Sequence, residues 1–512
     1  MTVTPRDMAN AVRVLAVDTL VRAKDGHPGT PTGGADIATT LFNRHLKFDP
    51  LAPRWPDRDR FVQSNGHGSM LLYSLLHLAG YEAISMEQIK NFRVLGSHTP
   101  GHPEYEPDHG VEITTGPLGQ GIANAVGMAV AERMLNARFG DAIVDHYTYA
   151  LVGDGCLMEG VAHEVISLAG HLKLGRLIVL YDDNQMTDDG VIGQAISEDY
   201  MQRFACAGWH VQECDGHDPD AISAAIEAAK RDDRPSMIRC RTLIGFGVPR
   251  IQNDRAAHGG KLFEEDARAI RERLGWTHPP FVIPDDIVAE WRKAGERGAG
   301  ARAAWQARVD ALDPVTRAEF QRLIEGRLPD GWEKALLAYK KAQVEAQPER
   351  SNIQTSGEIS RVLSHAIPEL VGGAPDLEAA TQHKRDMKSF TMADAEGGAR
   401  RATIFATGSE VAVALEAREA LQAVGVPTAV ISVPCWELFW EQETDYRAAV
   451  IGRGTVRVAV EAATRIGWER FVGEDGGIIG MTSFGASGPV AELFEHFGIT
   501  PARVVAAVKE RL

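Results

Sequence analysis

The clearest chemical signal in the sequence is a pair of oxygen-bearing side chains, each placed directly after a predicted buried strand. Asp154 follows a strand predicted over residues 147–152, and Asn184 follows the next predicted strand, over 176–181. The carboxyl ends of neighbouring parallel strands form the usual ligand crevice of such a sheet. We therefore expect both side chains to face the same crevice.

These two side chains have the chemistry of a divalent-cation site. Carboxylate and amide oxygens are hard ligands that suit Mg²⁺ or Ca²⁺, and the backbone carbonyl of Met186 is a candidate third ligand. The cation would offset the charge of a bound diphosphate, and Gly155 would let the backbone approach that ligand without a side-chain clash. An acidic turn after a strand is also a common helix N-cap, so the motif alone leaves both interpretations open.

A glycine-rich segment over residues 114–121 (TTGPLGQG) precedes an alanine-rich helix predicted over 121–138. Glycines before a helix N-terminus expose backbone amides, which commonly hold phosphates and other anions. The alternative interpretation is an ordinary loop whose shape is fixed by Pro117.

Four histidines stand beside glycine or proline in predicted loops: His27, His67, His102 and His258. Histidines in such loops can reach a ligand, donate hydrogen bonds and carry protons near neutral pH. Their spacing along the chain is not that of a zinc site, which favours contacts to substrate and cofactor. A structural role remains the alternative for each of them taken singly.

The elements that must position these residues follow an α/β pattern, in which segments of helical periodicity alternate with short β-branched runs. Further elements are predicted in the first part of the chain over 7–23 (helix) and 235–242 (strand). Charged helices, including 286–295 and 301–311, are followed by a helix over 351–373 and an irregular linker over 374–400. A second α/β unit is predicted from 401, with strands at 403–406, 428–433 and 457–460 and helices at 410–424 and 501–512.

Composition excludes several classes of protein. The 512 residues carry a formal net charge of −16, which argues against sequence-independent binding of nucleic acid. No segment has the length and apolarity of a membrane helix, and the N-terminus does not have the pattern of a signal peptide, so we expect a cytoplasmic protein without a membrane partner. The five scattered cysteines indicate neither a disulfide framework nor a zinc site.

Several motifs together resemble the transketolase family over about residues 1–345 and 400–512. They are KDGHPG, DRDRFVQSNGHGS, TPGHPE, TTGPLGQGIANAVGMA, DHYTYALVGDGCLMEG, YDDN, ATGSE and GMTSFG. The resemblance implies thiamine diphosphate and Mg²⁺ or Ca²⁺ as cofactors, and transfer of a two-carbon ketol unit between sugar phosphates. It also implies a homodimer, and a doubly wound parallel-sheet fold for the cofactor with a smaller C-terminal α/β domain.

The resemblance also implies roles for individual residues. The implied metal ligands are Asp154, Asn184 and the Met186 carbonyl. The implied cofactor contacts are His67, Gly116, Pro117, Leu118, Gly155, Glu159, Asn184 and His258. The residues implied to act on the sugar substrate are His27, His102 and His258.

The sequence departs from the family in its middle. Family members have one domain for the diphosphate, one for the aminopyrimidine ring and a C-terminal domain, whereas the stretch from residue 373 to 401 is too short for most of the pyrimidine domain. We therefore predict a diphosphate- and metal-binding domain, a helical linker, a remnant of the pyrimidine domain with its linker, and a C-terminal domain. Their bounds are 1–315, 316–350, 351–400 and 401–512.

This departure bears on activity. The missing domain supplies the family's glutamate that hydrogen-bonds the aminopyrimidine, and the loss of one such acid–base partner typically costs 10²–10⁴-fold in rate. The family's Arg-Lys-Ala-Ser segment appears as residues 353–356 (IQTS), so an arginine implied to bind substrate phosphate is absent, whereas Asp376 aligns with an acidic neighbour of the cofactor. We expect a transketolase of reduced activity.

Two alternatives stay open. The chain could be a non-catalytic homologue that acts as a scaffold or partner subunit, or one part of an enzyme completed by a separate pyrimidine-domain protein. Other thiamine enzymes share the Gly-Asp-Gly motif and the Asn that follows the next strand, but not the histidine loops.

Overall fold

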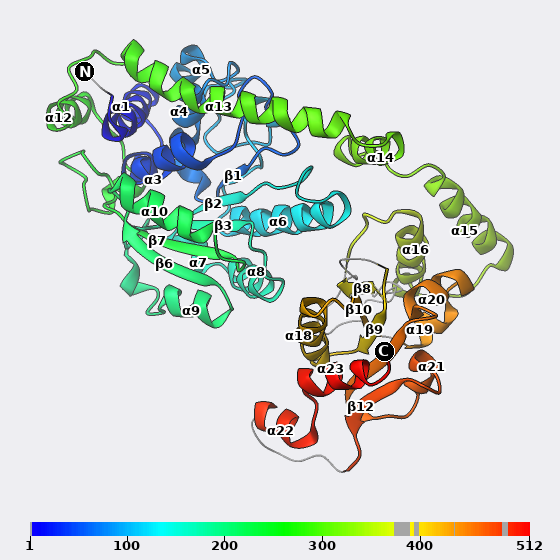
Figure 1. Cartoon of the computed structure of the whole chain (residues 1–512). Coiled ribbons are helices and arrows are strands. Elements are labelled where there is room, and N and C mark those ends of the chain that lie inside the picture. Colours follow the sequence, from blue (N-terminus) through cyan, green and yellow to red (C-terminus); the bar gives the residue numbers. More distant parts are fainter. Residues whose placement is uncertain (1–2, 373–389, 394–398, 435, 484–489) are drawn as a thin grey trace. The chain divides into compact units, whose positions relative to one another are not determined.

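The computed structural model describes residues 3–372, 390–393, 399–434, 436–483 and 490–512. The chain forms two compact units, Met1–Glu325 and Gly326–Leu512 (Figure 1). Among the described residues, none of the helices has the length and apolar character needed to cross a membrane.

The first unit is built on a five-stranded sheet in which every neighbouring pair is parallel. Its strand order is β1 (Arg60–Gln63), β2 (Thr148–Gly153), β3 (Leu177–Asp183), β7 (Ser236–Arg241), β6 (His210–Asp215). The three predicted strands correspond to β2, β3 and β7. Strands β1 and β6, which form the two edges of the sheet, were not predicted from the sequence. Strand β1 is short, and β6 is only partly buried and lacks a continuous apolar run.

Helices cover both faces of this sheet, because alternate residues of each strand point to opposite sides. Tyr149 and Leu151 of β2 join one apolar core, whereas Ala150 and Val152 join the other. The helices that contribute buried residues to the first core include α1 (Pro5–Ala23), α3 (Ala35–Thr40), α4 (Met70–Ala79), α10 (Pro219–Ala229), α12 (Glu264–Leu274) and α13 (Asp285–Asp310). Those of the second are α6 (Gln120–Phe139), α7 (Asp154–Met158), α8 (Gly160–His171) and α9 (Tyr200–Cys206). The predicted doubly wound parallel-sheet fold is confirmed.

Shorter elements complete the first unit. They are α2 (Gly29–Gly33), α5 (Met86–Lys90), α11 (Ala256–Gly259), α14 (Pro314–Ile324) and a two-stranded antiparallel hairpin of β4 (Met186–Thr187) and β5 (Gly190–Val191).

One prediction in this unit was wrong. The segments 286–295 and 301–311 were expected as separate helices, but they belong to the single helix α13. Two of the glycines in this helix, Gly295 and Gly298, are packing contacts. A Cβ on Gly298 would overlap the carbonyl oxygen of Phe48, and one on Gly295 would lie 2.8 Å from Cδ of Pro50. The helix tolerates these glycines because they let it approach the neighbouring backbone closely.

The second unit holds another five-stranded sheet, ordered β12 (Gly477–Met481), β11 (Val456–Thr464), β9 (Ala402–Ala406), β10 (Thr428–Ser432), β8 (Phe390–Ala393). Its pairs are parallel except for β8, which runs antiparallel to β10. The described helices are α15 (Trp332–Ala346), α16 (Asn352–Ala366), α18 (Glu410–Ala423), α19 (Trp436–Glu441), α20 (Thr444–Ile451), α21 (Glu469–Val472), α22 (Val490–Phe497) and α23 (Pro501–Lys509). The predicted C-terminal α/β domain is confirmed.

Two expectations about the segment before this sheet need correction. The helix predicted over 351–373 ends at Ala366, because the next residue, Ile367, precedes Pro368 and has an extended backbone (φ −129°, ψ 91°). Within the linker predicted to be irregular, Phe390–Ala393 is strand β8. Most of the rest of that linker, including Asp376, lies outside the described residues, as does the end of the GMTSFG motif.

Candidate active site

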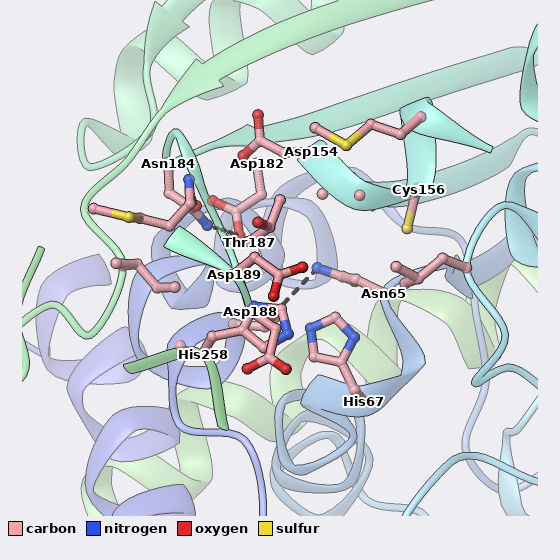
Figure 2. Close-up of a pocket in the computed structure, with 18 of the residues that line it drawn as sticks. Asn65, His67, Asp154, Cys156, Asp182, Asn184, Thr187, Asp188, Asp189 and His258 are labelled. Carbon is pink, nitrogen blue, oxygen red and sulfur yellow. Dashed lines mark hydrogen bonds between the residues drawn. The ribbon is translucent and has the colours of Figure 1, made fainter. Parts of the chain in front are cut away.

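A cavity of about 260 Å³ in the first unit lies at the carboxyl ends of β2 and β3 (Figure 2). Eight of the residues singled out from the sequence line it: His67, Leu118, Asp154, Gly155, Glu159, Asn184, Met186 and His258. They come from five separated stretches of the chain. The sheet brings these stretches to one edge, because Gly153 of β2 pairs in register with Asp182 of β3 and both strands end there.

Asp154 is the most constrained of these groups. Its side chain is buried, and its Oδ1 accepts a hydrogen bond from the hydroxyl of Tyr181. Its Oδ2 has no hydrogen-bond partner among the described residues. Burial, with Asp183 and Asp182 nearby, raises the pKa of Asp154 to about 7. A buried carboxylate oxygen without a partner is costly unless a cation or donor satisfies it. This oxygen is therefore suited to bind a cation.

Asn184 lies on the same side of the cavity and is held by its neighbours. Its Nδ2 donates to Asp182 Oδ2 at 3.3 Å, and its Oδ1 accepts from the backbone N–H of Met186 at 3.0 Å. Asp182 is itself fixed by a hydrogen bond from Thr242, and burial raises its pKa to about 6. These contacts orient the amide, and its oxygen keeps a lone pair for a metal ion.

The candidate metal set differs from a conventional cluster of acidic and histidine ligands. Within the described parts of the chain, no group of three or more His, Cys, Asp or Glu residues is placed to hold a metal ion. The predicted set contains one carboxylate, one amide and one backbone carbonyl, so oxygens of a bound ligand would have to complete it. Such partly protein-ligated sites are typical of Mg²⁺ with phosphates.

The four predicted histidines form one cluster. The ring centroids of His67 and His258 are 4.7 Å apart, and His27 lies 5.1 Å from His67, 5.9 Å from His258 and 6.3 Å from His102. Burial and mutual repulsion lower the pKa of His67 to about 3 and that of His27 to about 4. Burial also lowers the pKa values of His102 and His258. The cluster is therefore uncharged at neutral pH, and each ring can both donate and accept.

Some predicted residues lie next to the cavity and do not line it. These are His27, His102, Gly116 and Pro117. A Cβ on Gly116 would lie 3.3 Å from the His102 ring, and one on Gly66, beside His67, would press on Thr115 and the Gly116 backbone. The glycine-rich segment thus packs against the histidine loops, and Leu118 is its member that reaches the cavity.

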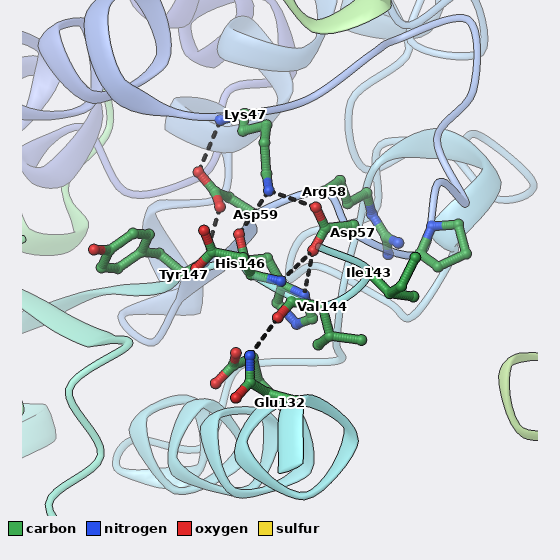
Figure 3. Close-up of polar contacts among 12 residues, drawn as sticks. Lys47, Asp57, Arg58, Asp59, Glu132, Ile143, Val144, His146 and Tyr147 are labelled. Carbon is green, nitrogen blue, oxygen red and sulfur yellow. Dashed lines mark hydrogen bonds and ion pairs between the residues drawn. The ribbon is translucent and has the colours of Figure 1, made fainter. Parts of the chain in front are cut away.

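A buried polar network fixes the position of β1, which leads into the His67 loop (Figure 3). The two oxygens of Asp59 accept from the backbone N–H groups of Lys47 and Tyr147, both at 2.8 Å. Asp57 accepts from Lys47 Nζ and from the Asp145 N–H, both at 2.7 Å. These bonds join the segments that precede β1 and β2, so the two strands deliver their following loops to the same cavity.

Several residues of the cavity lining were not predicted from the sequence. Asn65 is buried, its Nδ2 donates to Thr30 Oγ1 at 3.2 Å, and its Oδ1 has no partner in the part of the chain that the structure describes. The exposed residues Asp188 and Asp189, in the turn of the β4–β5 hairpin, also line the cavity. Each had a local signal: Asn65 stands in the same SNGHGS motif as His67, and an acidic pair before Gly190 (φ 126°) is typical turn chemistry.

Comparison with known proteins agrees with this geometry. The family model described as "Transketolase, thiamine diphosphate binding domain" matches residues 4–329, which contain the whole cavity. The chain belongs to the transketolase family. A second model, "Transketolase-like TK C-terminal domain", matches residues 389–500.

Transketolases from several organisms are similar over nearly the whole chain. The transketolase of Cereibacter sphaeroides is 41% identical and that of Rhodobacter capsulatus 38%, each alignment covering 99% of this chain and 98% of the relative. Among solved structures, transketolase from Leishmania mexicana has a TM-score of 0.69 at 31% identity, covering 100% of this chain and 97% of that one. A Pichia stipitis transketolase complexed with sedoheptulose-7-phosphate also has a TM-score of 0.69, at 28% identity over 99% of this chain and 98% of its own.

The chain has fewer residues than its alignments with the relatives have positions. The alignment with the Cereibacter sphaeroides transketolase extends over 651 positions, and the chain has 512 residues, so many positions are filled only by the relative. The two matched family models leave residues 330–388 between them.

Proposed function

We propose that this chain binds thiamine diphosphate through a divalent cation, Mg²⁺ or Ca²⁺, and transfers a two-carbon ketol unit from a ketose phosphate to an aldose phosphate. The observation that carries the proposal is the unpartnered, buried Oδ2 of Asp154 beside the oriented amide of Asn184, at the edge of the cavity. Asp154, Asn184 and the Met186 carbonyl would hold the cation, and diphosphate oxygens would complete its coordination.

The residues present fit such a cofactor. A Cβ on Gly155 would lie 2.8 Å from Cδ1 of Leu118, so the glycine leaves room for the Leu118 side chain at the cavity wall. Asn65 offers a further unpartnered oxygen, and His67 and His258 offer ring nitrogens on the opposite side. When bound, thiamine diphosphate supplies the nucleophilic carbon to which the ketol unit is attached. The chain's own residues would bind the diphosphate, orient it and shield the reacting end from water.

The histidine cluster supports the role proposed for His27, His102 and His258 at the sugar substrate. Uncharged rings can donate to sugar hydroxyls and accept their protons without burying a charge. The buried Nδ1 of His27 has no hydrogen-bond partner within the described ranges of the chain, which is the state expected of a group that binds a ligand. Gly116 and Pro117 would affect cofactor binding indirectly, by shaping the loop whose Leu118 lines the cavity. Glu159 lines the cavity itself and would contact the cofactor there.

The activity proposed is a reduced one. Two observations support the loss of most of the pyrimidine domain: many alignment positions are filled only by the relatives, and residues 330–388 match neither family model. The loss would lie between a first domain that ends near 315 and a C-terminal domain that begins near 401. The same observation favours a second candidate, a chain that binds the cofactor but needs a separate pyrimidine-domain protein for turnover or acts without catalysis.

We also propose that the chain is a homodimer built through its first domain. Val161, Leu168 and Leu172 are 38%, 47% and 45% exposed, and their spacing places them on one side of α8 and its C-terminal end. A row of exposed apolar side chains is typical of an interaction surface. Light scattering at micromolar concentration should return the mass of two chains, and a monomer would contradict this proposal.

The decisive experiment is calorimetry of thiamine diphosphate binding to the full chain with Mg²⁺, with Ca²⁺ and after treatment with a chelator. We expect binding with either cation and none after chelation. Asp154→Ala should abolish the metal-dependent binding, whereas Asp189→Asn, an exposed acidic residue on the same cavity, should retain it. Absence of metal-dependent binding in the unmodified chain would refute the proposal.

A turnover assay with xylulose 5-phosphate as donor and an aldose phosphate as acceptor separates the two candidate functions. Turnover 10²–10⁴-fold below that of a full-length relative supports the reduced enzyme. Cofactor binding without turnover supports the second candidate, which predicts that an added pyrimidine-domain protein restores the reaction.

A further inference from the structure

Two cysteines that do not line the candidate active-site cavity lie side by side on the last two strands of the first sheet. Cys214 of β6 and Cys240 of β7 are direct partners in the register of these parallel strands, and their Sγ atoms are 3.7 Å apart. Neighbouring strands are about 4.8 Å apart, and disulfides span Cα separations of about 4.4–6.8 Å. A bond between these two sulfurs therefore requires rotation of the side chains and no separation of the strands.

The two thiols differ in access. Cys240 is buried, and its Sγ lies 3.7 Å from the carbonyl oxygen of Ile238. Cys214 is partly exposed and lines an open hollow of about 650 Å³, whose other walls include Glu213, His217 and Arg241. A small disulfide can enter such a hollow and reach Cys214, but it has no comparable path to Cys240.

The two thiols also differ in acidity. The contact with Cys240 lowers the pKa of Cys214, whereas the contact with Cys214 and burial raise that of Cys240 well above the ordinary value. Because the thiolate is the nucleophile in exchange reactions, Cys214 has both the access and the acidity of the attacking group.

We propose that Cys214 and Cys240 are a dithiol pair that is reversibly oxidised to a disulfide by exchange with a small disulfide such as oxidised glutathione. The Cys214 thiolate attacks one sulfur of glutathione disulfide, which forms a mixed disulfide and releases one glutathione thiolate. Cys240 then loses its proton and attacks the Cys214 sulfur, which forms the protein disulfide and releases the second glutathione. Two protein thiols are oxidised, and one glutathione disulfide is reduced to two thiols.

The test is oxidation of the native full chain with excess oxidised glutathione, followed by blocking of free thiols and mass spectrometry without reduction. The experiment uses a Cys206→Ser, Cys435→Ser background, because Cys206 is exposed and Cys435 lies outside the described residues. We expect the intact mass to fall by about 2 Da, a peptide pair linked through Cys214 and Cys240, and reversal by dithiothreitol. No link in the folded chain, or a link formed only in denaturant, would overturn the proposal.

Single variants test the assigned order of attack. Cys240→Ser should accumulate a stable glutathione adduct on Cys214, because no second thiol resolves it. Cys214→Ser should leave Cys240 unmodified while the chain is folded. A glutathione adduct on Cys240 in folded Cys214→Ser, or an adduct on Cys214 that persists when Cys240 is present, would contradict the pair.

Discussion

The five-stranded sheets of the two units each carry a carboxyl group of raised pKa near the carboxyl end of a strand, with different surroundings. In the first unit Asp154 follows β2, and in the second Glu461 lies in the last part of β11. Burial raises the pKa of both groups to about 7. Asp154 faces a cavity with an amide and four histidines close by, whereas Glu461 shares a hydrogen bond with another carboxyl group, that of Glu410.

This difference shows that a shifted pKa alone does not identify a site. Perturbed carboxyl groups occur both at catalytic centres and in structural pairs. In the first unit the raised pKa of Asp154 occurs together with an unpartnered oxygen, a nearby amide and histidines, and a cavity that can hold a ligand. In the second unit Glu461 Oε2 also has no hydrogen-bond partner among the described residues, but the group beside Glu461 is a second carboxyl group, that of Glu410.

The largest effect is expected when each of the two acids is neutralised in turn, which tests whether the surroundings of the carboxyl group decide cofactor binding. Asp154→Asn should weaken metal-dependent thiamine diphosphate binding by about 10²–10³-fold, because the negative ligand that attracts the cation is lost. Glu461→Gln should leave the affinity unchanged. Calorimetry on both variants checks this, and equal losses in the two would show that burial of a carboxyl group, and not its surroundings, matters.

A second test concerns the packing of the first unit. Gly298→Ala should lower the free energy of unfolding of that unit by about 3 kcal/mol or more, because the added methyl overlaps the backbone of Phe48. Gly300→Ala in the same helix meets nothing within 4 Å and should stabilise by about 0.5–1 kcal/mol. Denaturant unfolding followed separately for the two units measures both, and a Gly298 variant as stable as the Gly300 variant would refute the close approach.

A third test asks whether burial in the first unit acts on bases as it does on acids. Burial, with Arg60 nearby, lowers the pKa of His146 to about 4. As the pH falls through about 6.5, His146 is therefore protonated in the unfolded chain but stays neutral in the folded chain. Folding stability is lost as the pH falls from about 7 towards 4. For this one group the loss should reach about 2 kcal/mol by pH 5.

The control for that test is His146→Gln, which removes the titrating group. Unfolding of the first unit, measured by denaturant between pH 7 and pH 5, should depend less steeply on pH in the variant. Identical slopes in the variant and the original chain would rule out His146 as a contributor.

The smallest expected effect belongs to the acid pair of the second unit. The pKa of Glu461 is raised in the folded state, so its contribution to stability is present below the unfolded pKa and is lost as the pH rises through about 7. Because Glu461 is only partly buried, solvent screens the effect, and Glu461→Gln should raise the melting temperature of this unit by roughly 1–3 °C at pH 8. A scan at pH 5 should show little change.

Local patterns in the sequence were enough to predict much of the fold. Apolar runs that end at acidic or glycine residues marked β2 and β3, and helical periodicity marked α1. An alanine-rich segment after a glycine-rich turn marked α6. Edge strands β1 and β6 were missed because they lack a continuous apolar run, and the continuity of α13 was missed because its glycines have the pattern of chain breakers. In each case the deciding contact comes from a distant part of the chain.

The sequence by itself determined the order of the α/β elements and the chemical types placed at the strand ends, since both depend on residues near one another in the chain. Only the tertiary structure decided that Asn65, Asp182 and the Asp188–Asp189 turn share a cavity with Asp154, and that Gly116 and Pro117 do not line it. It also decided that Cys214 meets Cys240. The physical reason is that parallel strands are joined by long crossover connections, so the residues that meet at one edge of the sheet come from separated parts of the chain.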